Sequence, residues 1–436
     1  MDVLRLGDAP PERLERMLRR ARAEALAPER LAHVRDIIED VRRRGDAAVL
    51  DHTERYDGVR LAPERLRVDR EDTVRAYEAV DDGLRTALET SIARVRRYSE
   101  WLRPPQLVLD EVEPGITVGV KWTPVDSAGV YVPSGKGAFP STFITMVAPA
   151  VVAGVEEIVA VTPPRRDGGA DPALLVAADL LGITQVFRAN GVAGVAALAF
   201  GTATFPRVGL LGGPGNPYVL AAQLALQGYG VRLLAALGPT ESMILADGTA
   251  DPHRLALDLL NEAEHGADSA AILVTDSAAL VDEVQDVLPR YLTQLPEGRR
   301  EFATAALQDC GGAVLARTFD EAVDFVNAYA PEHLQIATRD PAATLARIRH
   351  AAEVLLGQDT PFSAGNYAIG VPAALPTGGS ARVGSGVTVL SYLKTTSVAR
   401  LDPRGLAAVR PVVERLGRYE NFPAHVLAVT ARGGPA

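Results

Sequence analysis

The chain has very little of several features that mark particular classes of protein. It contains one cysteine, Cys310, so no disulfide bond can form within it and a disulfide scaffold is excluded. Aromatic residues make up only 5%, and no uninterrupted apolar run is long enough to span a bilayer. No apolar leader follows Met1 either. We therefore expect a cytoplasmic protein in a reducing compartment.

The sequence also lacks an excess of positive charge. Lys and Arg number 45 against 55 Asp and Glu, which gives a net charge of −10. Proteins that bind nucleic acids or membrane surfaces usually carry a basic excess on one face. The basic runs that do occur, RMLRRARAE and VRRRGD, also carry acidic residues at helical spacing, as on a solvated helix face. We expect neither nucleic acid nor membrane as a partner.

The composition is that of a globular protein, and the length of the chain favours two or more domains. The 436 residues are 47% hydrophobic and 23% charged. Residues 10–49 and 70–102 have apolar residues at three- and four-residue intervals, which predicts amphipathic helices. From about Val125, and again after Pro239, short β-rich runs alternate with helical stretches, which predicts parallel βαβ units. From about Leu390 the strand signal fades into a helical tail. The predicted fold class is α/β, with two incomplete Rossmann-like parallel-sheet domains, N-terminal helices and a helical C-terminal tail.

One candidate pair of functional residues lies on a well-delimited helix. Asp251 can cap this helix, Pro252 suits its first turn and Gly266 suits its end. Glu262 and His265, three residues apart, then share one face, a spacing that metal sites in helical proteins use. A surface carboxylate beside a C-terminal histidine, which favours the helix dipole, is the alternative. Spacing alone favours that alternative.

A second pair, Glu332 and His333, lies between a helix ending near Tyr329 and a strand starting near Leu334. In Rossmann-like folds, ligands bind where strand ends meet helix N-termini. Imidazole titrates near neutral pH and a carboxylate can orient it, so the pair can serve in acid–base chemistry. A simple charge pair in a loop is the alternative, and adjacency does not decide between the two.

Two glycine-rich loops complete the candidates. YVPSGKGAFPST begins at Tyr131 and LLGGPGNPYV begins at Leu210, and each follows an apolar run and precedes a helix. Backbone N–H groups in such loops can bind a phosphate or pyrophosphate, and Lys136 can add a positive charge. Neither loop matches GxGxxG, so tight turns and a solvated lysine remain the alternative.

Sequence blocks spread over nearly the whole chain resemble histidinol dehydrogenases. In the order of that family, from about Arg44 to His425, they are RGDAAVLDHTERYDGV, GVYVPSGKGAFPST, GGPGNPYV, LGPTESMILAD, LLNEAEHGADS, NAYAPEHL, ALPTGG, ARVGSGVTVLSYLK and ENFPAH. The resemblance implies a homodimeric, zinc-dependent enzyme that oxidises L-histidinol through histidinal to L-histidine with two NAD⁺. It also implies Glu332 and His333 as the acid–base pair and Tyr131 and Asn216 as cofactor-binding residues.

The resemblance further implies a zinc site that forms part of the substrate site. The implied zinc ligands are Glu262, His265, Asn366 and His425. The implied substrate-binding residues are Thr240, Glu262, His265, His333, Asn366, Glu420 and His425. Glu420 and His425 are implied to come from the neighbouring subunit.

Four positions depart from the family pattern. Glu262 replaces a glutamine ligand and Asn366 replaces an aspartate ligand, so the carboxylate and the amide are exchanged and the charge of the ligand set is unchanged. Ala373 replaces a histidine of the substrate pocket, and Ala193 replaces a glutamine near the cofactor. Two alternative functions follow: oxidation of another small amino alcohol or polar diol, and ligand binding without catalysis.

Together with this resemblance, the sequence predicts four parts of the chain. They are an N-terminal helical segment (1–25), a first Rossmann-like domain with the metal and acid–base residues (26–125 plus 240–382), a second Rossmann-like domain on the cofactor side (126–239), and a helical tail that contacts the partner subunit (383–436).

Overall fold

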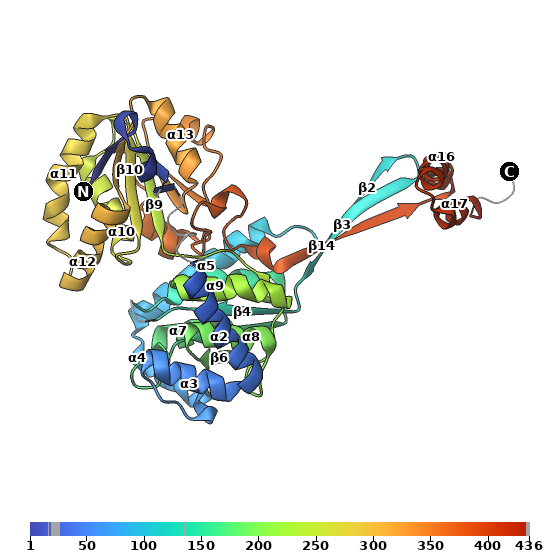
Figure 1. Cartoon of the computed structure of the whole chain (residues 1–436), viewed down its shortest axis with the longest axis horizontal. Coiled ribbons are helices and arrows are strands. Elements are labelled where there is room, and N and C mark those ends of the chain that lie inside the picture. Colours follow the sequence, from blue (N-terminus) through green and yellow to red (C-terminus); the bar gives the residue numbers. More distant parts are fainter. Residues whose placement is uncertain (16, 19–26, 135–136, 433–436) are drawn as a thin grey trace. The chain divides into compact units, whose positions relative to one another are not determined.

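The computed structural model describes residues 1–15, 17–18, 27–134 and 137–432. The chain forms two compact units: the first comprises Met1–Trp101 and Asp126–Tyr392, and the second Leu102–Val125 and Leu393–Ala436. The first unit contains two parallel sheets with helices on both faces, named here the six-stranded lobe and the five-stranded lobe (Figure 1). The predicted α/β class with two Rossmann-like sheets is confirmed.

The six-stranded lobe is built on a fully parallel sheet. Its strands, in spatial order, are β1 (Val3–Arg5), β11 (Gly312–Leu315), β10 (Ala270–Thr275), β9 (Glu241–Ala246), β12 (His333–Ala337) and β13 (Glu353–Leu356). The helices of this lobe include α10 (Pro252–Ala263), α11 (Ala278–Leu292), α12 (Glu297–Ala305), α13 (Phe319–Tyr329) and α14 (Pro341–Leu345). Residues of β9 alternate between its faces: Ile244 packs with α10 and α11, and Met243 and Leu245 pack with α13.

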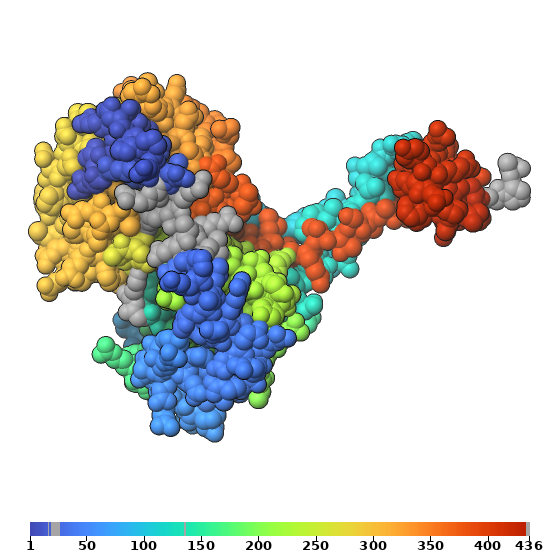
Figure 2. Space-filling model, in the orientation of Figure 1, coloured from blue at the N-terminus to red at the C-terminus, as the bar shows by residue number. Residues whose placement is uncertain are grey.

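The N-terminal segment is only partly helical, contrary to the expectation for residues 1–25. Residues 3–5 form the edge strand β1, which pairs in parallel with β11, and the dark-blue N-terminal residues lie against this lobe in Figure 2. The tripeptide is too short to show a strand period in the sequence. Residues 11–15 are helical, and 16 and 19–25 lie outside the described residues.

The five-stranded lobe carries most of the N-terminal helices. Its parallel strands, in spatial order, are β6 (Gln185–Arg188), β5 (Glu157–Thr162), β4 (Ser127–Tyr131), β7 (Leu210–Gly212) and β8 (Arg232–Leu233). Its helices are α2 (Pro28–Arg44), α3 (Asp46–Asp57), α4 (Arg70–Ala79), α6 (Pro140–Ala153), α7 (Pro172–Leu180), α8 (Gly191–Phe200) and α9 (Pro217–Leu226). The expected division assigns residues 26–125 to the other sheet. Helix α2 instead buries Val34, Ile37, Ile38 and Val41 against α8, α9 and β5.

The second unit contains a small antiparallel sheet as well as helices. Strand β14 (Leu393–Leu401) pairs with β3 (Ile116–Pro124), which pairs with β2 (Leu107–Glu113). Helices α16 (Pro403–Tyr419) and α17 (Pro423–Thr430) follow β14. The chain thus ends in helices, as predicted, but the tail begins with a strand, and residues 102–125, expected in the first Rossmann-like domain, belong to this second unit. Most residues of β14 are exposed on both faces, so no apolar alternation marks the strand in the sequence.

A buried ion-pair network ties α4 to the edge of the five-stranded sheet. Arg188, at the end of β6, is fully buried and donates to the Asp72 carboxylate and to the main-chain oxygens of Arg65 and Arg67. Asp72 also accepts from Arg65 (2.9 Å) and Arg75 (2.5 Å). Although burial opposes its charged form, these arginines, Arg188 foremost, hold the pKa of Asp72 well below its usual range.

Within the described part of the chain, no helix is both long and apolar enough to cross a membrane. Cys310 is half-buried and packs against the apolar cluster that β9, β10 and α13 share.

Candidate active site

The acid–base pair lies at the N-terminal ends of strands in the six-stranded lobe. His333 begins β12, and the first residues of the two neighbouring strands are Glu241 of β9 and Glu353 of β13. This edge differs from the expected one, at which strands end and helices begin. Helices α10 and α13 have their C-terminal ends at this edge, because each leads into the next strand of the parallel sheet. Helix C-termini carry partial negative charge, so this edge favours cations.

Glu332 and His333 are buried, with 6% and 2% of their surfaces exposed. The Oε1 atom of Glu332 lies 3.8 Å from Nε2 of His333, and its Oε2 accepts a hydrogen bond from the backbone N–H of Glu241 at 2.8 Å. The pair follows Ala330, which ends α13 with a φ of 57°. Non-glycine residues adopt this left-handed conformation at a cost of order 1–3 kcal/mol, so the turn into the site is strained.

Burial and mutual interaction shift the protonation of both groups. Burial raises the pKa of Glu332 to about 8, against the opposing effect of the neighbouring His333. Burial opposes the charged form of His333, but the carboxylates of Glu332 and Glu353 outweigh it and raise the pKa of the imidazole to about 10. Both shifts favour the protonated forms at neutral pH, so the pair can donate a proton there and acts as a base after it has lost a proton at higher pH.

Three of the four expected zinc ligands meet beside this pair. The Glu262 carboxylate is 1% exposed, its Oε2 lies 3.4 Å from Nε2 of His265, and its Oε1 accepts from the Asn366 amide at 2.9 Å. Asn261 donates to the same oxygen at 2.9 Å. Among the described residues, no group of three or more His, Cys, Asp and Glu side chains has the arrangement of a metal site.

These residues nevertheless fit a divalent cation when the amide is counted. A carboxylate buried to this degree needs compensating charge, and the imidazole of His265 lies beside it. Rotation of the Asn366 side-chain amide would turn its oxygen instead of its nitrogen toward an ion beside Glu262. One carboxylate oxygen, one imidazole nitrogen and one amide oxygen suit Zn²⁺ and leave a position open.

A cavity of about 530 Å³ contains both groups of residues. Glu262, His265, Glu332, His333 and Asn366 line it. Thr240 and Ala373, also singled out in the sequence, lie on its wall. The structure therefore brings these candidates together in one cavity, although Thr240 and Ala373 are far apart along the chain.

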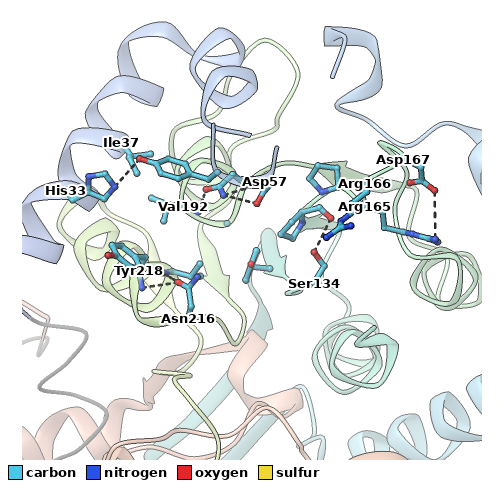
Figure 3. A pocket seen from close by; sticks show the side chains of 17 residues that line it. His33, Ile37, Asp57, Ser134, Arg165, Arg166, Asp167, Val192, Asn216 and Tyr218 are labelled. Atoms are coloured by element: carbon cyan, nitrogen blue, oxygen red, sulfur yellow. Dashed lines mark hydrogen bonds and ion pairs between the residues drawn. The ribbon is translucent and has the colours of Figure 1, made fainter. Parts of the chain in front are cut away.

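A larger cavity of about 940 Å³ lies in the five-stranded lobe, at the ends of its strands (Figure 3). Tyr131 and Asn216 line both cavities, as does Ser134. In Figure 3, Asn216 and Tyr218 lie on one side of the space and Arg165 and Arg166 on the other. Lys136 of the first glycine-rich loop lies outside the described residues. Ala193 is buried in the core of α8, while its neighbours Gly191 and Val192 line this cavity.

Two helix N-termini form part of the wall of this larger cavity. Helices α8 and α9 begin at its wall, capped by Asn190 and Asn216, whose side chains accept from backbone N–H groups of the first turn. Helix N-termini carry partial positive charge and suit a pyrophosphate. Asp57 faces the same cavity and accepts from the Asn190 amide at 3.3 Å. Burial raises the pKa of Asp57.

Glu420 and His425 belong to the second unit, at the end of α16 and in α17. Both side chains are exposed. Their implied roles require a second subunit and stay predictions.

Sequence reasoning missed three carboxylates near these cavities, namely Asp57, Glu241 and Glu353. Glu241 and Glu353 share one weak signal, a glutamate at the first position of an otherwise apolar strand. Asp57 ends a helix and carries no signal beyond its charge.

A buried acid–base pair, in a cavity that shares part of its wall with a cavity at the strand ends of a Rossmann-like sheet, suits an α/β dehydrogenase. The family model for histidinol dehydrogenase matches residues 20–433. The chain therefore belongs to the histidinol dehydrogenase family, and it is an NAD-dependent dehydrogenase. A histidinol dehydrogenase of Synechocystis sp. is 43% identical over 430 residues, which are 99% of this chain and 98% of that protein. A histidinol dehydrogenase homolog of Colwellia psychrerythraea is 38% identical over 98% of this chain and 96% of its own length.

A crystal structure agrees with these sequence relatives. The histidinol dehydrogenase of Elizabethkingia anophelis matches with a TM-score of 0.92 at 31% identity, over 99% of this chain and 98% of that one.

Proposed function

We propose that the protein oxidises L-histidinol through histidinal to L-histidine with two NAD⁺ and one zinc ion per subunit. The observation that carries this proposal is that the two cavities share Tyr131, Ser134 and Asn216, while Glu332 and His333 line the smaller one. A dinucleotide in the larger cavity would therefore border the wall of the substrate cavity. When bound, NAD⁺ accepts a hydride from the substrate carbon in each oxidation.

The buried pair supplies the proton transfers. In the first oxidation Nε2 of His333 takes the proton of the substrate hydroxyl as the carbon loses its hydride. In the second oxidation Glu332 takes a proton from the water that adds to the aldehyde. Burial of both side chains keeps bulk water from competing for these protons. Thr240 would contact the substrate, and its position on the cavity wall supports this role.

Zinc would be held by Glu262, His265 and Asn366, with His425 of a second subunit as the fourth ligand. When bound, zinc binds and polarises the polar groups of the substrate. Glu420 of the second subunit would meet the substrate, so a homodimer would complete each site. The exposed positions of Glu420 and His425 are compatible with this role. In this arrangement the six-stranded lobe carries the metal and acid–base residues, and the five-stranded lobe carries the cofactor.

The direct test is turnover by the purified protein. We expect two NADH per L-histidinol, about one zinc per subunit, and loss of turnover on chelation that added zinc restores. Bound zinc without NADH from L-histidinol would contradict the proposed substrate. The methyl side chain of Ala373 on the cavity wall favours one second candidate, another small amino alcohol or polar diol, so a panel of these belongs in the same assay.

Exchange of the carboxylate and the amide predicts an effect on zinc affinity that one single variant and one double variant can isolate. Glu262→Gln leaves no anionic ligand among the three in the first unit, so zinc affinity is expected to fall by at least about tenfold. Asn366→Asp in the same chain restores one carboxylate on the opposite side of the ion, and the double variant is expected to recover the affinity. Competition with a chromogenic chelator measures both. Equal affinities in all three proteins would show that neither side chain binds zinc.

A further inference from the structure

The imidazole of His333 has a carboxylate partner that the mechanism above does not use. Glu353 begins β13 and lies opposite His333 in the parallel register of β12 and β13. Its Oε2 accepts a hydrogen bond from Nδ1 of His333 at 2.5 Å, and the two side chains are only 5% and 3% exposed. Nε2, the other ring nitrogen, lies on the side of Glu332. Each nitrogen of the ring thus faces a different carboxylate.

Stability alone does not account for a glutamate at this position. Among the described residues the Glu353 side chain makes one hydrogen bond, to His333, and its Oε1 is buried with no hydrogen-bond partner. A half-satisfied buried carboxylate is costly, and an apolar residue in its place is often at least as stable. Gly365 leaves room for the Glu353 carboxylate, because any residue with a Cβ atom at that position would bring this atom within 2.7 Å of Oε1 of Glu353.

The hydrogen bond decides which nitrogen of His333 can act as a base. An ionised carboxylate only accepts hydrogen bonds, so Nδ1 must carry a proton. In the neutral ring the lone pair then lies on Nε2, the nitrogen that faces Glu332. The ring of Phe362 packs edge-on against the imidazole, with centroids 5.9 Å apart, and restricts its rotation. The hydrogen bond to Glu353 and the contact with Phe362 therefore fix both the orientation and the tautomer of the His333 ring.

We infer that Glu353 is a positioning residue for the oxidation, a role that rests on the proposed function: it holds His333 as the Nδ1–H tautomer and stabilises the imidazolium that forms. The proton of the substrate hydroxyl moves to Nε2, Nδ1 keeps its own proton, and Glu353 stays ionised throughout. This is the role of the carboxylate in a carboxylate–histidine pair, which acts on the reaction only through the ring.

Kinetics and nitrogen NMR of the zinc-loaded protein test this inference. Glu353→Gln is expected to lower kcat for NADH formation on the order of 10²-fold, with the KM values for alcohol and NAD⁺ unchanged. Glu353→Asp keeps the charge and is expected to recover part of kcat. Glu157→Gln is the matched control, since Glu157 also begins a strand and accepts from a neighbouring strand, through Gln185, in the other lobe.

The spectroscopic readout does not depend on turnover. The chain has seven histidines, so ¹⁵N-histidine labelling resolves them, and His333→Asn assigns the signal of His333. We expect a protonated Nδ1 in the wild type and a shift of this signal in Glu353→Gln but not in Glu157→Gln. A wild-type ring protonated only on Nε2, or equal kcat in Glu353→Gln and Glu157→Gln, overturns the inference. If the wild type forms no NADH from L-histidinol, the proposed function fails, and the nitrogen signal alone then decides the pairing.

Discussion

Replacement of Glu332 by glutamine is expected to slow the second oxidation most, by about 10²- to 10⁴-fold, the usual contribution of a general base. Glutamine keeps the size of the side chain and can still accept from the backbone N–H of Glu241, so the fold around the site should persist. The glutamine lacks the basic carboxylate oxygen that lies 3.8 Å from Nε2 of His333. The yield should therefore fall from two NADH per L-histidinol toward one, with histidinal trapped by an added carbonyl reagent.

Glu321→Gln is a suitable control for this variant. Glu321 lies in the first turn of α13, pairs with Arg317 and has no part in either cavity among the described residues. Its replacement should leave both oxidations unchanged. A Glu332→Gln enzyme that still releases two NADH at the wild-type rate would remove Glu332 from the mechanism.

The largest expected effect on stability comes from Arg188→Met. Arg188 is fully buried, and its loss leaves Asp72 buried with the partly exposed Arg65 and Arg75 as its remaining ion-pair partners among the described residues. Removal of one partner from a buried ion pair costs about 3–5 kcal/mol. Chemical unfolding of the five-stranded lobe should therefore begin at a markedly lower denaturant concentration. Arg317→Met removes an arginine whose side chain is 75% exposed and should leave the unfolding midpoint nearly unchanged.

The same network predicts how stability depends on pH. Because the folded protein holds the pKa of Asp72 below its usual range, the network stabilises the fold at pH values above about 4, where an unfolded aspartate is ionised. That contribution is lost as the pH falls toward the folded pKa. The difference in unfolding midpoint between wild type and Arg188→Met should thus shrink in acid. A difference that stays constant down to pH 2 would contradict this account.

Local signals in the sequence predicted individual helices well. Asp251 caps α10 through the N–H of His253 at 2.8 Å, and Pro252 is its first residue, as the sequence indicates. Such capping depends on residues within one turn, so it can be recognised without knowledge of the fold. The i, i+3 spacing also correctly predicts that Glu262 and His265 share one face, since their side chains are 3.4 Å apart.

The sequence by itself thus determined the α/β class, the two parallel sheets and, through its resemblance to a family, nearly all candidate site residues. Only the tertiary structure decided that α2 packs on the five-stranded lobe, that β3 pairs with β14, and that Glu353 faces Nδ1 of His333. Helix caps and strand periods arise from neighbours in the chain. Strand order and the pairing of first residues across a sheet depend on which apolar faces meet, and no local pattern specifies that choice.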